Sequence, residues 1–264
     1  MTQSVIPAGY SSAEINKMVS ALSRENKPLY ELNLDELNRA SPDLIVTQDL
    51  CGVCAVSSDD LREVVAGMQS TPKLISQKAD RFDQVLEEML RLGSVTGRVD
   101  AAQHLIDEIR TRIQKVKDRV QQTDSRPRTV LLEWLNPLFS AGHWTPELIH
   151  TAGGIEMIGV PNTKSRQISW KDLHDADPER LILACCGRSI SETRQELQSE
   201  EIMENLQKLS CVQTDHLYLM NGSAYLNRPG PRLIDAVEIL SSILHPPIAP
   251  LSSREGHFVK ASLF

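Results

Sequence analysis

A stripe of apolar residues between Val99 and Gln122 constrains the fold of this chain more than any other feature. Acidic residues come first in this stretch and basic residues follow, an order that suits the dipole of a helix. A single helix of this length would run roughly 36 Å, about the width of a small domain. The apolar side chains recur mostly at steps of three and four residues, which places them on one face of a helix: Leu105, Ile106, Ile109, Ile113, Val116 and Val120.

Strand and helix patterns on both sides of this stretch predict an α/β protein in which the long helix is a rod between two lobes. The alternative is one helix of an all-α bundle. The predicted divisions are 1–97 for an N-terminal lobe, 98–124 for the connecting helix, 125–247 for a C-terminal lobe and 248–264 for a loose tail. Predicted strands cover 43–47, 72–75, 129–134, 181–184 and 217–220, predicted helices include 192–209, and 135–142 is predicted to be a loop.

Composition and charge exclude several classes of protein. With 264 residues, 41% of them hydrophobic and 24% charged, the chain can build one large or two modest globular domains. The net charge of −7 and the lack of a basic patch argue against nucleic-acid binding. No run of 18 apolar residues is present, so we expect no membrane-spanning helix. We also expect a monomer.

The cysteines and the first residues indicate a compartment. Five cysteines, two of them adjacent at Cys185 and Cys186, do not suit a disulfide framework and favour a reducing environment. The opening residues lack the pattern of a secretory signal peptide. We therefore expect a cytoplasmic protein as the sequence stands, and a periplasmic or exported one if the true start is missing.

One segment recurs. LDELNRASPDLIV at 34–46 aligns with WKDLHDADPERLI at 170–182, with leucine, alanine and proline at matching positions. Both copies predict a helix, a proline-acid turn and a buried strand that leads to a cysteine-bearing loop. Ligands of open α/β sheets lie at the carboxyl ends of the strands. The repeat therefore predicts a crevice edged by Gln48 to Cys54 on one side and by Cys185 to Arg188 on the other.

Four segments, in order, carry a resemblance to a known family: SPDLIVTQDLCGVCAVS, VLLEWLNPLFSAGHWTPELIHTAGG, ADPERLILACCG and MNGSAYLNRPGPRLIDAVEILSSILHP. They resemble the cobalamin-binding proteins among the substrate-binding proteins of ABC importers, in the class III group that also binds iron chelates. The resemblance implies two three-layer α/β lobes joined by one long backbone helix, a corrinoid such as cobalamin as ligand, and an importer permease as partner. An iron chelate or haem is the alternative ligand. Members usually begin with a strand and helix that carry a Ser-Leu-x-Pro loop, so the first lobe is expected to be shortened.

The resemblance and the residue types together predict the ligand contacts. A flat macrocycle needs broad apolar and aromatic contact with a few polar anchors. His143 could also be an axial ligand of cobalt or iron through a neutral ring nitrogen. Arg228 could pair with a carboxylate, amide or phosphate of the ligand. The predicted ligand-binding residues are Gln48, Asp49, Cys51, Cys54, Glu133, Trp134, His143, Trp144, Cys186, Tyr225 and Arg228.

A second function remains open from the residues alone. Cys51 and Cys54 form a CxxC pair, which with Cys186 could be a zinc or thiol-redox centre. No second CxxC and no histidine pair lie nearby in the sequence. Enzyme signatures such as GxSxG, HExxH, a P-loop or a dinucleotide fingerprint are absent, so we expect no catalytic activity.

Overall fold

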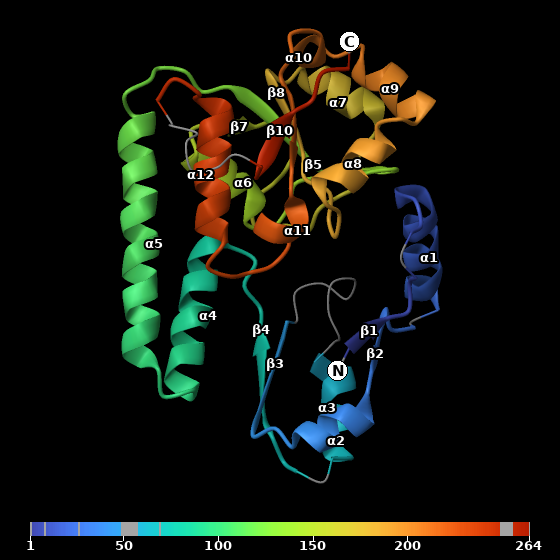
Figure 1. Cartoon of the computed structure of the whole chain (residues 1–264), viewed down its shortest axis with the longest axis vertical. Helices are drawn as coiled ribbons and strands as arrows, with labels where there is room; N and C mark the ends of the chain where they lie inside the picture. Colours follow the sequence, from blue (N-terminus) through green and yellow to red (C-terminus); the bar gives the residue numbers. More distant parts are fainter. Residues whose placement is uncertain are drawn as a thin grey trace. The chain divides into compact units, whose positions relative to one another are not determined.

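The computed structural model describes residues 2–7, 9–25, 27–48, 58–68, 70–248 and 256–263. The chain forms two compact units, Met1–Ala79 and Asp80–Phe264 (Figure 1). Each unit combines helices with strands, so the predicted α/β class is confirmed. Among the described residues, no helix combines the length and the apolar character that crossing a membrane requires.

The first unit contains two small sheets. Strands β1 and β2 pair antiparallel, whereas β3 and β4 pair in parallel, from Leu44 opposite Lys73 to Gln48 opposite Gln77. Leu37 and Ile75 are almost fully buried and belong to its core. Its elements are β1 (Thr2–Ser4), α1 (Ser12–Arg24), β2 (Tyr30–Leu32), α2 (Leu34–Ala40), β3 (Leu44–Gln48), α3 (Ser58–Ala66) and β4 (Lys73–Gln77).

The second unit is built on a six-stranded mixed sheet. Strands β5, β8 and β9 are parallel, and β6 and β10 are antiparallel at the two edges, in the order β10-β9-β8-β5-β6 with β7 beside β5. The strands are β5 (Arg128–Leu135), β6 (Leu138–Ser140), β7 (Ile155–Glu156), β8 (Arg180–Leu183), β9 (Leu217–Met220) and β10 (Phe258–Lys260). The helices are α4 (Phe82–Val95), α5 (Val99–Val120), α6 (Thr145–Thr151), α7 (Trp170–Ala176), α8 (Ile190–Glu196), α9 (Glu200–Leu206), α10 (Ser210–Gln213), α11 (Gly222–Tyr225) and α12 (Leu233–Leu244).

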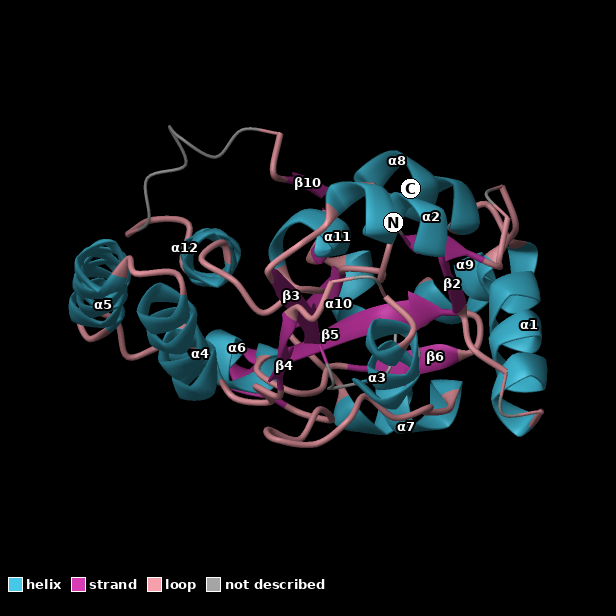
Figure 2. Ribbon diagram, turned by 90° about the horizontal axis from the view of Figure 1, so that it is seen from below, coloured by secondary structure: helices cyan, strands magenta, loops and turns pink. Residues whose placement is uncertain are grey.

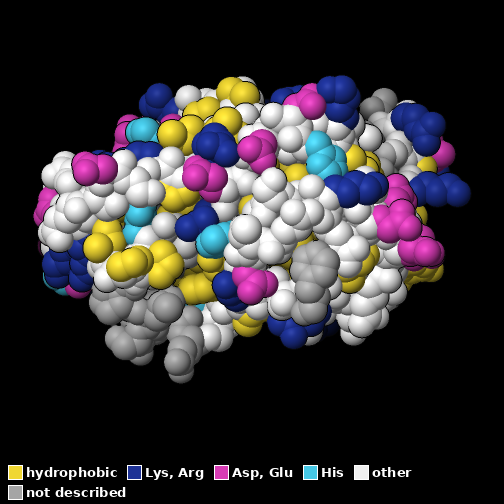
Figure 3. Space-filling view, turned by 90° about the horizontal axis from the view of Figure 1, so that it is seen from above, with side chains coloured by type: hydrophobic (Ala, Val, Ile, Leu, Met, Phe, Trp, Pro, Cys, Tyr) yellow, Lys and Arg dark blue, Asp and Glu magenta, His cyan; other side chains and the backbone are white. Residues whose placement is uncertain are grey.

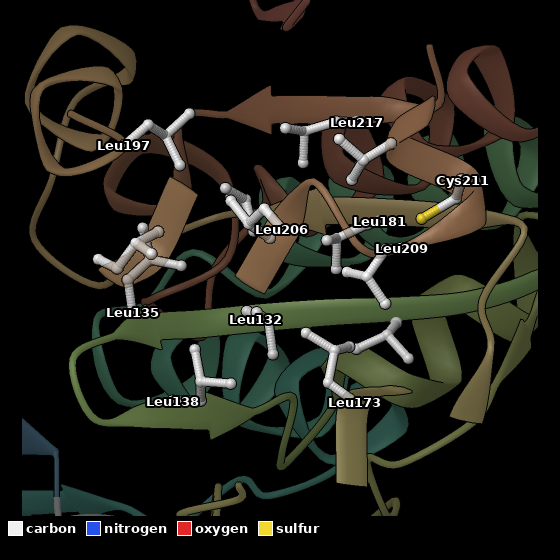
Figure 4. Packing of buried hydrophobic residues seen from close by; sticks show 14 of the residues in the cluster. Leu132, Leu135, Leu138, Leu173, Leu181, Leu197, Leu206, Leu209, Cys211 and Leu217 are labelled. Carbon is white, nitrogen blue, oxygen red and sulfur yellow. The ribbon is translucent and has the colours of Figure 1, made fainter. Parts of the chain in front are cut away.

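Both faces of this sheet are covered. Side chains alternate between the two faces of a strand, and in β5 one set, which includes Leu132, joins a cluster with residues of α7, α9 and α10 (Figure 4). The opposite face lies against α6 and α12: a Cβ at Gly154 would touch Thr129, Leu244 and Ile149 together. Figure 2 shows β5 running through the middle of the unit. Because helices cover both faces of its sheet, the second unit is a three-layer α/β structure.

The long helix is a single element. Helix α5 runs unbroken over Val99–Val120, as the apolar stripe predicts, and packs on α4 and α12. Its polar side also contacts α12, because the Arg112 guanidinium bonds to Asp235 at 2.5 Å and to Glu238 at 2.7 and 2.9 Å. Figure 1 shows α12 between α5 and the sheet.

The two copies of the repeat have the same local structure. Asn33 and Ser169 cap seven-residue helices by accepting a hydrogen bond from the backbone N–H three residues later. Ser41 and Asp177 then end these helices in the left-handed conformation, with φ of 41° and 37°. A proline and a strand that pairs in parallel with its neighbour follow in both. The sequence match therefore marks a structural repeat.

Three local predictions were wrong. Residues 138–140, predicted to be loop, form β6 and return along β5. Residues 258–260, predicted to belong to a loose tail, form β10 against β9. The predicted helix 192–209 is two helices, because α8 ends at Glu196 and α9 begins at Glu200. In the sequence, the boundary between the compact units lies at residues 79–80. The predicted lobe division at residue 97 was placed just before the long helix and remains a prediction.

Candidate functional site

The predicted site residues of the second unit gather where the parallel strands end. The backbone of the loop after β8 continues the pairing with β5, since Cys186 N–H donates to Glu133 O at 2.9 Å. Asn227, in the loop after β9 and α11, lies with its side-chain amide 3.4 Å from the Cys186 sulfur. The carboxyl ends of β5, β8 and β9 therefore share one edge, as the βα pattern predicts.

Trp134 is held from two sides. Its indole N–H donates to Asn136 O at 3.1 Å. The Arg188 guanidinium lies 5.7 Å from the centre of its ring, at cation–π distance. Arg188 is itself paired with Glu196 at 3.1 Å, and both side chains are only 11% exposed. Arg188 was predicted only as the end of the crevice edge Cys185 to Arg188 and not as a ligand contact, and Glu196 was not predicted.

Trp144 and His143 are neighbours with different surroundings. Trp144 is 3% exposed, and its indole N–H donates to Leu226 O at 2.8 Å, so it fastens its loop to the loop that precedes α12. The His143 ring lies 5.8 Å from the Trp144 ring and is only partly buried. Trp144 is thus a buried anchor of its loop, whereas His143 is nearer the surface.

The backbone of His143 is unusual. Its φ is 51°, in the left-handed region that side chains other than glycine seldom adopt. Its N–H donates to Thr163 O at 2.6 Å and its carbonyl accepts from Asn162 N–H at 3.1 Å. Within the described part of the chain its buried Nδ1 has no hydrogen-bond partner. Burial lowers the pKa of the imidazole below its ordinary value of 6.5, which Asp80 partly opposes and Lys164 reinforces, and this shift favours the neutral ring.

Glu133 makes bonds to two loops. Its Oε1 accepts from Gly142 N–H at 3.1 Å and its Oε2 accepts from the Ser165 hydroxyl at 2.5 Å. Both oxygens of this predicted ligand contact are therefore bonded to protein groups.

The loop after β9 places the remaining predicted residues. Tyr225 O–H bonds to His257 Nδ1, and the two rings meet edge to face with centres 5.3 Å apart. The Asn227 amide satisfies both of its ends when its oxygen accepts from Gly187 N–H at 2.7 Å and its nitrogen donates to Gly222 O at 3.0 Å. Arg228 is exposed. No sequence signal pointed to His257, whose part in the structure comes only from folding of the chain end.

Of the four predicted contacts in the first unit, only Gln48 lies among the described residues. Gln48 ends β3, opposite Gln77 of β4. Asp49, Cys51 and Cys54 lie outside the described residues, so the predicted contacts and the CxxC pair at these positions stay predictions.

Two grooves of the second unit lie apart from these residues. One, of about 450 Å³, is lined by α4, α5, α6 and the β7 region, and the other, of about 610 Å³, lies between α5 and the start of α12. Neither is lined by a predicted site residue. On the face seen in Figure 3, charged side chains of both signs are interspersed with apolar ones.

The described cysteines and metal-ligating side chains form neither a metal cluster nor a reactive thiol pair. Within the described ranges, no group of three or more His, Cys, Asp and Glu side chains is placed to hold a metal ion. A macrocyclic chelate supplies most of the ligands of its own metal, so a single histidine could be enough for it. Burial raises the pKa of the Cys185 thiol to about 12 and that of Cys211 to about 11. These two cysteines are therefore unreactive packing residues at neutral pH.

Known proteins resemble this chain over most of its length. A family model described as periplasmic binding protein matches residues 17–224. The vitamin B12-binding protein of Vibrio cholerae is 21% identical over 81% of this chain and 72% of its own length. The cobalamin-binding protein of Halobacterium salinarum is 26% identical over 63% of this chain and 45% of its own length.

Solved structures share the fold. A periplasmic heme-binding protein from Pseudomonas aeruginosa has a TM-score of 0.69, with 18% identity, over 84% of this chain and 78% of that one. The periplasmic vitamin B12-binding protein of Vibrio cholerae has a TM-score of 0.61, with 19% identity, over 81% and 78%. The family predicted from the sequence is confirmed: this chain belongs to the periplasmic binding protein family.

Proposed function

We propose that this protein binds a corrinoid, or a related metal chelate such as haem, and delivers it to an ABC importer. The family is one of binding proteins rather than enzymes, and the relatives named above bind vitamin B12 or heme. The ligand would lie against the strand-end region of the second unit that carries Trp134, His143 and Cys186. We further propose that the protein acts as a monomer outside the cytoplasm, where importers of this kind collect their ligands.

The observation that carries the proposal is the state of His143. A neutral imidazole on a strained loop, beside the carboxyl ends of three parallel strands, is suited to coordinate a metal that already has a macrocycle around it. Ligating histidines usually have a hydrogen bond on their second nitrogen. The buried Nδ1 has no such bond within the described residues, so Nε2 is the proposed ligand and coordination would be weak to moderate in strength.

Titration with three chelates tests the proposal. The purified protein is titrated with aquocobalamin, cyanocobalamin and ferric haem, with visible absorption and calorimetry as readouts. Aquocobalamin and haem have a position open to an imidazole, whereas the cyanide of cyanocobalamin blocks it. We expect binding heat with at least one chelate, and a band shift that His143→Ala abolishes and that His150→Ala, a change at an exposed histidine of α6, preserves. No heat and no band shift with any of the three would refute the proposal.

The zinc or thiol-redox alternative is separated by metal analysis. Zinc that purifies with the protein in a ratio near one, and is lost in Cys54→Ser, would support it. We expect no such zinc.

A further inference from the structure

Two loops meet at the end of β5. We define the His143 loop as residues 141–144 and the facing loop as residues 157–165. Between them, His143 N–H donates to Thr163 O at 2.6 Å and Asn162 N–H donates to His143 O at 3.1 Å. Their backbones touch, because a Cβ at Gly142 would lie 2.3 Å from Ser165 N. The position of His143 therefore depends on how these loops are held together.

One side chain bridges both loops. Glu133, near the end of β5, accepts from Gly142 N–H in the His143 loop and from the Ser165 hydroxyl in the facing loop. Each of its oxygens serves a different loop, and β5 itself is fixed by pairing with β6 and β8. Both oxygens therefore already accept a hydrogen bond from a loop, so a ligand that used this carboxylate would share it with the loops.

The base of the facing loop is fastened by a second carboxylate. Glu156 accepts from the backbone N–H of Leu131 at 3.2 Å, of Ile158 at 3.1 Å and of Gly159 at 2.9 Å. The facing loop is thus tied to β5 at its start by Glu156 and near its end by Glu133. The part that Glu133 holds is the part that faces His143.

We propose that Glu133 is a positioning residue, which clamps the His143 loop and the facing loop together and so sets the place of the His143 imidazole for the chelate. This inference rests on the proposed function and changes the role of Glu133, which the sequence predicts to touch the ligand. The clamp depends on the length of the side chain and on its hydrogen bonds rather than on its charge. A glutamine in place of Glu133 would still span both loops, with its oxygen accepting from Gly142 and its amide donating to the Ser165 oxygen. Aspartate would keep the charge but is one methylene too short.

The test compares Glu133→Gln, Glu133→Asp and Glu133→Ala. Hydrogen exchange of the backbone amides at 141–144 is measured in the free protein, and affinity for aquocobalamin and ferric haem is measured by absorption. We expect the Gln variant to behave like the wild type. The Asp and Ala variants should both exchange faster in the His143 loop and bind about tenfold more weakly, the size expected for losing one to two hydrogen bonds. Exchange in α12 should be unchanged in every variant, and Glu204→Ala, at an exposed carboxylate of α9, is the matched control.

The opposite ranking would overturn the inference. If the Asp variant binds like the wild type and the Gln variant like the Ala variant, Glu133 acts by its charge on the ligand. If loop exchange is unchanged in the Ala variant, or increases without any loss of affinity, no clamp positions the site. If the wild-type protein binds neither chelate, the proposed function fails. In that case hydrogen exchange of the His143 loop alone tests the clamp. The clamp is supported if the Gln variant exchanges like the wild type and the Asp variant like the Ala variant, and any other ranking overturns it.

Discussion

At the scale of single residues, Gly153 combines a left-handed backbone with close packing around the place of a side chain. Its φ is 92°, and a Cβ there would lie 2.5 Å from His245 Nε2 and 2.6 Å from Val120 Cγ1. Gly97 has a comparable φ of 68°, but a Cβ there would meet nothing within 4 Å. The pair separates the cost of backbone strain from the cost of overpacking.

Gly153→Ala should therefore destabilise the protein more than Gly97→Ala. We expect losses in the free energy of unfolding of about 2–4 kcal/mol for the first change and about 1 kcal/mol for the second. Urea unfolding followed by fluorescence measures both. Equal losses would mean that the close packing of α5, α6 and α12 around Gly153 can relax.

Glu156 is the residue whose protonation should couple most to stability. Desolvation raises its pKa from 4.5 to about 7, against the effect of its three backbone hydrogen bonds, with the charge of Glu133 adding to the rise. A raised folded-state pKa means that the folded protein holds the proton more tightly. The stabilisation is therefore complete below about pH 4.5 and is lost as the pH rises through about 7.

A neutral variant should remove this dependence. When the pH is raised from 5 to 8, we expect the free energy of unfolding of the wild type to fall by about 1–3 kcal/mol more than that of Glu156→Gln. In Glu156→Gln the side-chain NH2 group would face the Leu131 N–H, which now donates to the carboxylate, so the variant also loses a hydrogen bond. The pH slopes are therefore compared rather than the absolute stabilities. Urea unfolding at the two pH values measures the slopes. Parallel slopes for the two proteins would contradict the assigned pKa.

At the scale of elements, the sequence predicts what local periodicity determines. The stripe on α5 and the short apolar run of β5 were sufficient to locate these elements, because the helix buries one regular face and the strand is buried on both of its faces. Strands β6 and β10 have three residues each and exist only through their partners β5 and β9. The break between α8 and α9 has no glycine or proline to mark it. These features depend on tertiary pairing and could not be predicted from local sequence.

The site was predictable to a similar degree. Strand-end position located Trp134 and Cys186 correctly at one edge of the sheet. Sequence position could not show that both oxygens of Glu133 bond to loops or that Trp144 is buried, because those facts depend on segments far apart in the chain.

The contact between α5 and α12 contains an ion-pair cluster whose contribution can be measured. Arg112 reaches two carboxylates of α12, and its side chain is 34% exposed, so solvent screens the cluster in part. Arg112→Ala should cost about 1 kcal/mol of unfolding free energy. Arg110→Ala, which removes an exposed pair with Asp107 at 3.8 Å, should cost nearly nothing. Equal effects would show that the cluster adds no stability to the packing of the two helices.

At the scale of the whole molecule, the two units differ in how much core they have. In β5, β8 and β9 of the second unit, Leu131, Ile182 and Leu219 have no exposed surface. In the described part of the first unit, the best-buried large side chains, such as Ile75 and Leu37, are 2% and 4% exposed and belong to short elements. A chain segment of about 80 residues buries a smaller fraction of its surface than a larger one and is correspondingly less stable.

We therefore expect the first unit to open first. Native-state hydrogen exchange should show amides of β3 and β4 exchanging at least tenfold faster than those of β5 and β8, because local opening follows the density of buried contacts. Saturation with the chelate should slow exchange in every segment whose opening releases the ligand. Protection confined to the second unit would mean that the ligand is held there alone, and equal exchange in both units without ligand would show that they unfold together.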